Sequence, residues 1–247
     1  LFRWTEGRIN RLADLIITSS TPGRQELTRF WQMPLQQVTA LPDGVDTTVF
    51  RYFPRTAARE RLGLDEQVPV IVYLGLFNQY QGVDLLIHAA RLMIQQGRNF
   101  HLLLMGYPEQ EYRQLVDELN INSFVTFTGR VDYAEAPLLL SAADLAVSPK
   151  VSDTEANGKL LNYMACGLPV VAFDAPVNWE LLGDDGIYAA FGDVVDLARC
   201  LSAALTDRDA LRQRGKRLRM RAVEQLAWDV RVKELETVYQ RLLKVEK

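Results

Sequence analysis

From residue 68 onward, the sequence alternates short apolar runs with amphipathic stretches of helical length. The runs occupy residues 68–75, 100–106, 124–129, 144–149, 168–173 and 186–189. Most are continuously apolar, which is typical of strands buried on both faces of a parallel sheet. Helical patterns fill residues 83–96, 108–119, 134–142, 159–166 and 194–205. The alternation predicts an α/β fold with a doubly wound, Rossmann-like parallel sheet over residues 68–206.

The flanking segments follow other patterns. Residues 207–247 predict C-terminal helices only, at 207–226 and 229–245. Residues 1–41 predict helix, strand, helix and strand, at 3–12, 15–19, 22–31 and 37–41, with Thr21 beginning the second helix and Pro22 at its first position. Turn residues are frequent in the stretch between these parts, so we expect residues 42–67 to form a linker and a lead-in helix.

Composition excludes several classes of protein. The 247 residues are 48% hydrophobic and 24% charged, which is typical of a globular chain, and no apolar run approaches the roughly 18 residues that span a bilayer. The net charge of −3 argues against a dedicated nucleic-acid partner. Cys166 and Cys200 form no CxxC pair, so we expect a reducing compartment. Without a HExxH motif or a Cys/His cluster, we expect no bound metal, and His88 and His101 as structural residues.

Ligands of open α/β sheets bind at the carboxyl ends of the strands, so the loops there are the candidate site. The loop at residues 148–158 is polar and longer than the usual connection of about 2–6 residues. Asn157 and Gly158, at a helix start beside Lys159, offer free backbone N–H groups to a phosphate, and Glu155 is placed to accept hydrogen bonds from hydroxyl groups. The alternative is that Asn157 and Gly158 simply cap the helix.

Residues 143–173 (ADLAVSPKVSDTEANGKLLNYMACGLPVVAF) resemble the signature ADxxxxPSxxEGFGxxxxEAMACGxPVVA of the retaining glycosyltransferases of family four. Further segments fit in the same order: residues 13–19 (ADLIITS), 42–46 (PDGVD), 75–89, 127–131 (FTGRV), Gly192-Asp193 and Ala227-Trp228. The resemblance covers nearly all of the chain. It implies the two-domain GT-B fold, with this chain as the C-terminal, nucleotide-sugar-binding half and residues 1–41 as the remnant of an N-terminal, acceptor-binding half.

The resemblance also implies residue roles. Glu155 is the catalytic candidate, as the first carboxylate of the family's Glu-x7-Glu pair, which contacts hydroxyls of the donor sugar. Asn157 and Gly158 would contact the diphosphate, and Arg130 and Val131 the nucleotide base. The other expected donor-binding residues are Gly75, Gln81, Gly82, Lys150, Lys159 and Asn162. No cofactor or metal is implied; the expected partners are a nucleotide-diphosphate sugar and an acceptor held by the other half.

Two departures from the family pattern bear on activity. Asn162, one residue short of the family spacing, stands where the second Glu is usual. In the segment usually written GRxxxxKG, Leu76 and Gln81 replace both cations that face phosphate. A diphosphate in a partly dry site needs compensating charge, so we expect Lys150, Lys159 and Arg130 to supply it. The alternative is that Lys150 and Lys159 are solvated surface lysines.

Three functions remain open. The first is a retaining glycosyltransferase, inactive as this isolated chain because half of the cleft would be absent. The second is a catalytically weakened nucleotide-sugar-binding or regulatory domain, as the departures at Leu76, Gln81 and Asn162 indicate. The third is a sugar-nucleotide epimerase, although its acid and base carboxylates have no counterpart that we can place.

Three surface features complete the expectations. Glu180 either faces the donor site or interacts with a helix dipole. Residues 212–221, with six basic residues, form either a solvated helix face or a contact with anionic lipid headgroups, so the expected location is cytoplasmic, with peripheral membrane contact as an alternative. The apolar side chains near the N-terminus are expected to be exposed or to form a dimer interface: Trp4, Leu12, Leu15, Ile16 and Ile17.

Overall fold

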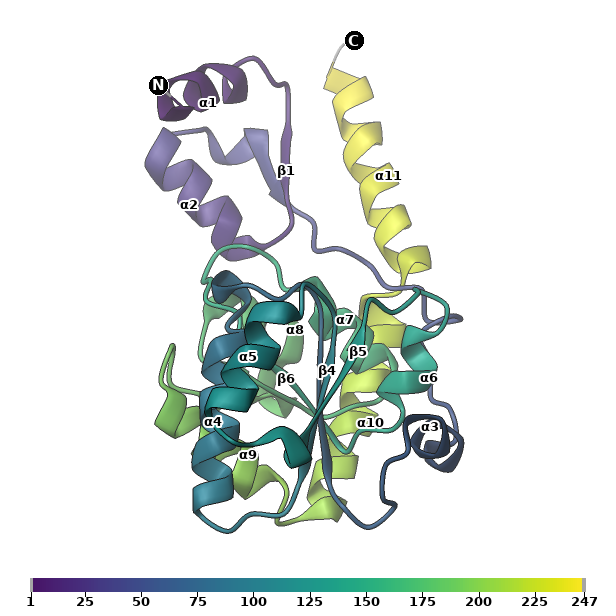
Figure 1. Cartoon of the computed structure of the whole chain (residues 1–247). Coiled ribbons are helices and arrows are strands. Elements are labelled where there is room, and N and C mark those ends of the chain that lie inside the picture. The colour runs from purple at the N-terminus through teal and green to yellow at the C-terminus, as the bar shows by residue number, and fades with distance from the viewer. Residues whose placement is uncertain (1, 246–247) are drawn as a thin grey trace.

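The computed structural model describes residues 2–245 and has a six-stranded parallel sheet at its centre (Figure 1). The strands are β3 (Val70–Leu74), β4 (His101–Met105), β5 (Val125–Gly129), β6 (Leu145–Ser148), β7 (Val170–Phe173) and β8 (Ile187–Ala189). Their order across the sheet is β5-β4-β3-β6-β7-β8, and every neighbouring pair is parallel. This is the order of a doubly wound Rossmann sheet, so the predicted fold class is confirmed.

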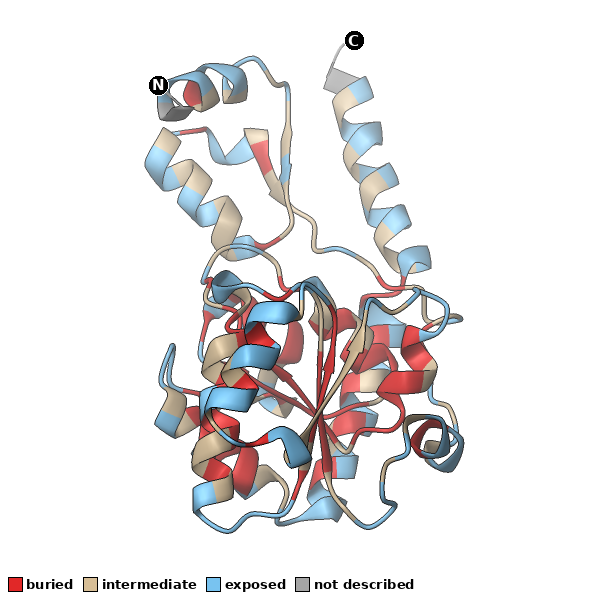
Figure 2. Ribbon diagram, in the orientation of Figure 1, coloured by how far each residue is buried: buried red, intermediate tan, exposed pale blue. Residues whose placement is uncertain are grey.

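Helices cover both faces of the sheet, which explains why the strands are continuously apolar. Val70 and Val72 pack into one core, and Ile71 and Tyr73 into the other. The first core is completed by α6 (Ala136–Leu140), α7 (Gly158–Ala165), α8 (Pro176–Leu182) and α10 (Arg208–Gln225). The second is completed by α4 (Val83–Gln95), α5 (Gln110–Glu118) and α9 (Val194–Ala204). Figure 2 shows the central strands β4, β3, β6 and β7 as almost wholly buried, whereas the edge strand β5 and most of the edge strand β8 are only partly buried.

The first 40 residues form a smaller unit. It contains α1 (Phe2–Asn10), β1 (Ile16–Thr18), α2 (Thr21–Trp31) and β2 (Val38–Ala40), with β1 and β2 paired in parallel. Helix α2 is capped by Ser20, whose side chain accepts a hydrogen bond from Gly23 N, rather than beginning after a Thr21 cap. Both this unit and α11 (Trp228–Val245) lie beyond the carboxyl ends of the main strands (Figure 1).

Short elements complete the chain. Helix α3 (Arg55–Leu62) is the expected lead-in helix, while α8 begins at Pro176, inside a segment that the sequence pattern treats as a loop. Single turns of 3-10 helix occur at Leu35–Gln37, Gln79–Gln81, Asn122–Phe124 and Gly183–Asp185.

Arg59 fixes α3 to the amino ends of the central strands. Its side chain is fully buried and donates hydrogen bonds to Ala142 O at 3.0 Å and Val68 O at 2.9 Å. It also pairs with Asp144 at 2.8 Å, and the Asp144 carboxylate accepts a bond from Val70 N at the start of β3. One buried guanidinium therefore connects the lead-in helix with the starts of β3 and β6.

The strand order places the candidate site between β3 and β6. The chain leaves β3 toward β4 and β5 on one side, whereas β6 leads to β7 and β8 on the other. Loops that leave two such strands diverge and open a crevice at the carboxyl edge of the sheet. Those loops are the segments 75–82 and 149–157.

Candidate functional site

A cavity of about 320 Å³ lies in this crevice. It is lined by Leu74, Gly75, Leu76, Gln81, Lys150, Glu155, Ala156, Asn157, Gly158, Lys159 and Asn162. The structure therefore brings together eight of the residues expected from the sequence, from the β3 loop, the β6 loop and the first turns of α7. Gly82, Arg130 and Val131 are not in its lining.

Glu155 is an exposed carboxylate held by two neighbours. The Tyr80 hydroxyl donates a hydrogen bond to Glu155 Oε2, and Lys150 Nζ lies 3.2 Å from the same oxygen. The Tyr80 hydrogen bond, followed by Lys150, holds the pKa of Glu155 below its usual value, so the group is ionised at neutral pH. Tyr80 is a site residue that the sequence did not reveal, because only the 3-10 turn at Gln79–Gln81 brings it to the β6 loop.

Lys150 is nearly buried, with 3% of its surface exposed, and also donates a hydrogen bond to Ala156 O at 2.9 Å. Lys159 is partly buried; its ammonium group donates to Gln81 Oε1 and lies 5.1 Å from the centre of the Tyr73 ring. Burial, and then the nearby charge of Lys150, lowers the pKa of Lys159 to about 7. The alternative that both lysines are solvated surface residues is therefore wrong.

Asn157 is buried and does not cap α7 with its side chain. Its Nδ2 donates to Ser148 Oγ at 2.9 Å and to Asn178 Oδ1 at 3.0 Å, which ties the end of β6 to α8. Asn178 in turn donates to Phe173 O at the end of β7. Asn157 thus occupies the N-cap position of α7, as the alternative expected, but without a side-chain capping hydrogen bond. Because the first N–H groups of a helix have no acceptor within it, those of Gly158 and Lys159 are available at the cavity.

Gly82 positions the site without lining its cavity. Its φ is 69°, and a Cβ atom there would lie 2.0 Å from Pro149 O. Only glycine allows the β3 loop to approach the β6 loop so closely. Gly75 makes a second close approach, since a Cβ there would lie 3.0 Å from Lys159 Cε.

Arg130 and Val131 follow β5, at the edge of the sheet and two strands away from β3. Arg130 is exposed, with its guanidinium 5.6 Å from the centre of the Tyr107 ring. Val131 packs against the core on the α6 face. These two residues are thus separated from the eight that line the cavity.

Glu180 interacts with the start of a helix, as one of the two expectations states, but the helix is α2 rather than its own. Glu180 lies near the end of α8, and its carboxylate accepts hydrogen bonds from the backbone N of Thr21 and, at 2.6 Å, from the Thr21 hydroxyl. It therefore contacts the start of α2 in the smaller unit, not the start of its own helix. The neighbouring Ser20 hydroxyl donates to Thr154 O at 2.5 Å, next to Glu155.

The remaining expectations have mixed outcomes. Cys166 and Cys200 are both buried and unpaired. His101 has a structural partner, with Nε2 at 2.8 Å from Thr126 Oγ1, whereas His88 is exposed on α4. Near the N-terminus, Trp4, Leu12 and Ile17 are exposed, and Leu15 and Ile16 are half-buried. Among the helices described, none is both long enough and apolar enough to cross a membrane.

A protein-family model described as "Glycosyl transferases group 1" matches residues 68–207, more than half of the chain. The chain belongs to this family. Among its relatives, a D-inositol 3-phosphate glycosyltransferase of Nocardia farcinica is 29% identical over 86% of this chain and 49% of the relative. An MMP alpha-(1->4)-mannosyltransferase of Mycolicibacterium hassiacum is 29% identical over 94% of this chain and 55% of the relative. The chain thus spans about half the length of these curated relatives.

Two solved structures share the fold. Sucrose-phosphate synthase from Thermosynechococcus elongatus superposes with a TM-score of 0.85 at 25% identity, over 97% of this chain and 61% of the other. HepE from Anabaena, solved in complex with UDP and glucose, has a TM-score of 0.83 at 21% identity, over 96% of this chain and 67% of the other. These neighbours are GT-B glycosyltransferases, so the expected GT-B relationship is confirmed.

Proposed function

We propose that this chain is the donor-binding half of a glycosyltransferase that moves a sugar, with retention, from a nucleotide-diphosphate sugar to an acceptor bound by another domain. The observation that supports it best is the cavity between β3 and β6, where an ionised carboxylate, two lysines and the start of α7 meet. The names of the relatives and the UDP in HepE support the same proposal.

The geometry suits each group to one role. The N–H groups at the start of α7 and the Lys159 ammonium group face the space for a diphosphate, and the Lys150 ammonium group lies beside it. These cations supply the charge that Leu76 and Gln81 do not. When the bond from the anomeric carbon to the diphosphate oxygen breaks, negative charge grows on the leaving group, and fixed positive groups stabilise it.

Glu155 and Asn162 then face the sugar and ribose hydroxyls, respectively. The ionised Glu155 accepts hydrogen bonds and stabilises positive charge on the sugar ring during transfer. An acceptor that attacks from the face of the departing diphosphate gives retention. In this proposal the base extends toward Arg130 and Tyr107, which follow β5 and β4 and whose guanidinium and ring centre lie 5.6 Å apart.

A second candidate function is a nucleotide-sugar-binding domain with weakened catalysis. One observation favours it: the two lysines are already engaged, Lys159 by Gln81 and Lys150 by Glu155. A diphosphate must compete with both contacts for the two ammonium groups, and this competition lowers its affinity.

Calorimetry tests the donor proposal directly. The 247-residue chain is titrated with UDP, GDP, ADP and UDP-glucose, and we expect at least one diphosphate to bind. Absence of binding by all four would reject the donor site. For the protein with both halves, the anomeric configuration of the product by NMR tests retention. If it binds a donor but transfers no sugar, the second candidate is correct. We expect no turnover by the isolated chain.

The exposed Trp4, Leu12 and Ile17 also lead us to propose that the smaller unit contacts an acceptor-binding domain or a second copy of this chain. Light scattering distinguishes these, since only the second gives a dimer of the isolated chain. The two unpaired, buried cysteines support a cytoplasmic location.

A further inference from the structure

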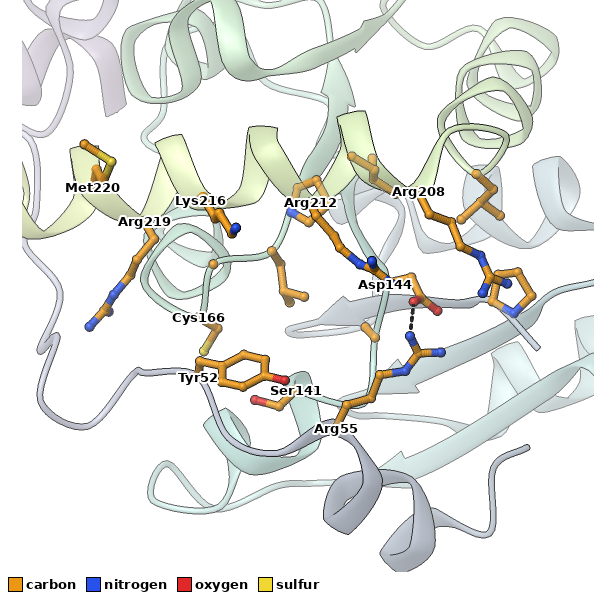
Figure 3. A pocket seen from close by; sticks show the side chains of 17 residues that line it. Tyr52, Arg55, Ser141, Asp144, Cys166, Arg208, Arg212, Lys216, Arg219 and Met220 are labelled. Carbon is orange, nitrogen blue, oxygen red and sulfur yellow. Dashed lines mark ion pairs between the residues drawn. The ribbon is translucent and has the colours of Figure 1, made fainter. Parts of the chain in front are cut away.

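A second cavity, of about 790 Å³, lies at the opposite end of the sheet from the donor site. It opens between α10 and the segment 52–55, beneath the amino ends of β3, β6 and β7 (Figure 3). It shares no described lining residue with the cavity around Glu155. Nothing in the proposed transfer reaction uses it.

The floor of this basal cavity is apolar. It is formed by Ala143, Cys166, Leu168, Pro169 and Leu211, and its lining is mostly apolar surface. Tyr52 and Met220 flank it and are largely exposed. Apolar surface that is concave and open to solvent marks a ligand site more often than a flat patch does.

A row of cations runs along one wall. Arg208, Arg212 and Lys216 are four residues apart on α10, so their side chains project from the same stripe of the helix (Figure 3). Lys216 has no hydrogen bond or ion pair among residues 2–245. Arg208 donates only to Gln67 O at 3.2 Å, and Arg212 pairs at 3.2 Å with the highly exposed Asp209.

The other basic residues of α10 are engaged elsewhere. Arg214 donates to Asp184 O at 3.0 Å, Arg217 pairs with Asp185 at 2.6 Å and Arg221 donates to Glu180 O at 2.9 Å. Arg219 lines the cavity, but it donates hydrogen bonds to Phe50 O and Thr47 O, and these bonds anchor the linker. The basic stretch 212–221 is therefore not one uniform solvated face.

The carboxylate in the basal cavity does not cancel this charge. Asp144 pairs with Arg55 at 2.7 Å and with the buried Arg59 at 2.8 Å, and it accepts the Val70 N–H bond. Its charge is thus satisfied within the fold. The field at Arg212 and Lys216 remains positive over an apolar floor.

We propose that the basal cavity binds a single amphipathic phosphate, with its alkyl chain on the apolar floor and its phosphate on Arg212 and Lys216. Arginine and lysine bind phosphate through charge-assisted hydrogen bonds. Leu168 and Cys166 are nearly buried at the bottom of the cavity, so a flat lipid surface does not reach them. A single alkyl chain that inserts into the cavity does reach Leu168 and Cys166. Each methylene group that it buries there raises the affinity by up to about fourfold.

The test compares octyl phosphate, butyl phosphate and inorganic phosphate by calorimetry on the 247-residue chain. We expect octyl phosphate to bind, butyl phosphate to bind at least about tenfold more weakly, and inorganic phosphate not to bind detectably. Equal affinities for all three would overturn the proposal, because a simple anion site ignores the chain. So would binding to phosphatidylglycerol vesicles without binding of monomeric octyl phosphate.

Two double variants on the same helix locate the site. Arg212→Gln/Lys216→Gln removes two charges from the row, and Arg214→Gln/Arg217→Gln removes two from other faces. Octyl phosphate affinity should fall about tenfold or more in the first and less than twofold in the second. Equal losses would show attraction by net charge alone, which contradicts a built site.

Met220→Asn tests the apolar wall, and because Met220 is exposed the fold should tolerate it. The ratio of the affinities for octyl and butyl phosphate should fall in this variant. An unchanged ratio would show that Met220 does not contact the alkyl chain. Nucleotide binding at the Glu155 cavity should be unaffected in every variant. This proposal therefore fails or holds independently of the proposed transfer reaction.

Discussion

Lys150 Nζ lies 3.2 Å from Glu155 Oε2, although the lysine is nearly buried and the carboxylate is exposed. The lysine belongs to the β6 loop, and its ammonium group lines the cavity beside Glu155. This arrangement divides the proposed binding of the donor between two groups, because Lys150 attracts a phosphate and Glu155 meets the hydroxyl groups.

Replacing Lys150 tests this division. Lys150→Met removes the charge while it keeps much of the buried stem, so we expect affinity for UDP to fall about tenfold, the effect of one lost charge-assisted hydrogen bond. Calorimetry measures it. Lys233→Met, on the exposed side of α11, is the control for loss of one positive charge. An unchanged affinity of Lys150→Met for UDP would show that Lys150 does not bind the diphosphate.

Binding of UDP-glucose should depend on pH through Lys159. The pKa of Lys159 in the free protein is about 7, so the side chain is charged below that pH and neutral above it. The diphosphate favours the charged form and raises its pKa in the complex. Affinity is therefore highest below about pH 7 and falls, by up to tenfold per pH unit, between the pKa of the free protein and that of the complex.

Lys159→Arg provides the matched control, because arginine stays charged throughout this range. We expect a flat pH profile for this variant in calorimetry. UDP-glucose is used because, unlike UDP, it has no terminal phosphate that titrates near pH 6. A flat profile for the unmodified chain would contradict the assigned role of Lys159.

The Tyr80 hydroxyl should control the ionisation of Glu155. Its hydrogen bond is the largest cause that holds the pKa of Glu155 down, so Tyr80→Phe should raise that pKa toward its usual value. Titration of the Glu155 carboxyl carbon by NMR measures the shift. Tyr52→Phe, in the basal cavity, should leave it unchanged.

Gly82 and Gly97 form a matched pair for the close approach of the two loops. Their φ values are 69° and 72°, yet a Cβ on Gly97 meets no atom within 4 Å, whereas one on Gly82 would meet Pro149 O at 2.0 Å. Gly97→Ala should cost about 1–2 kcal/mol in unfolding free energy from backbone strain alone. Gly82→Ala should cost clearly more and weaken UDP binding. Equal denaturant midpoints for the two variants would contradict the tight loop contact.

Arg59 should be the most sensitive charged residue for stability. Arg59→Leu leaves the Asp144 carboxylate with one cation and removes the bonds to Ala142 O and Val68 O, so we expect a loss of about 3–5 kcal/mol. Arg61→Leu removes an exposed pair with Glu135 and should cost at most about 1 kcal/mol. Chemical unfolding followed by circular dichroism compares them.

The sheet was predictable because its signal is local. The run at residues 68–75 is apolar at successive positions, because helices cover both faces of the sheet there. The structure forms β3 within this run. The start of α2 was harder, because both Ser20 and Thr21 are good caps before Pro22, and only the hydrogen bond to Gly23 N shows which one acts. Pro176 starts α8 in a segment whose turn residues hide the helix.

The site was predictable as a set of loops but not as a set of contacts. All loops at the carboxyl ends of the strands were candidates, and the family resemblance is what joined the segments around Gln81 and Glu155 in one expected site. The burial of Lys159 depends on Gln81 and Tyr73, which come from another loop and strand. The partner of Glu180, Thr21, is 159 residues away in the sequence, and no local pattern reveals such a pair.

Two consecutive residues hold the smaller unit against the donor loops: Ser20 binds the Thr154 carbonyl, and Thr21 binds Glu180 on α8. Thr154 directly precedes Glu155. This dipeptide therefore connects the start of α2 both to α8 and to the backbone that carries the carboxylate. Hydrogen bonds made by the smaller unit thus reach the residue next to Glu155 from outside the cavity that Glu155 lines.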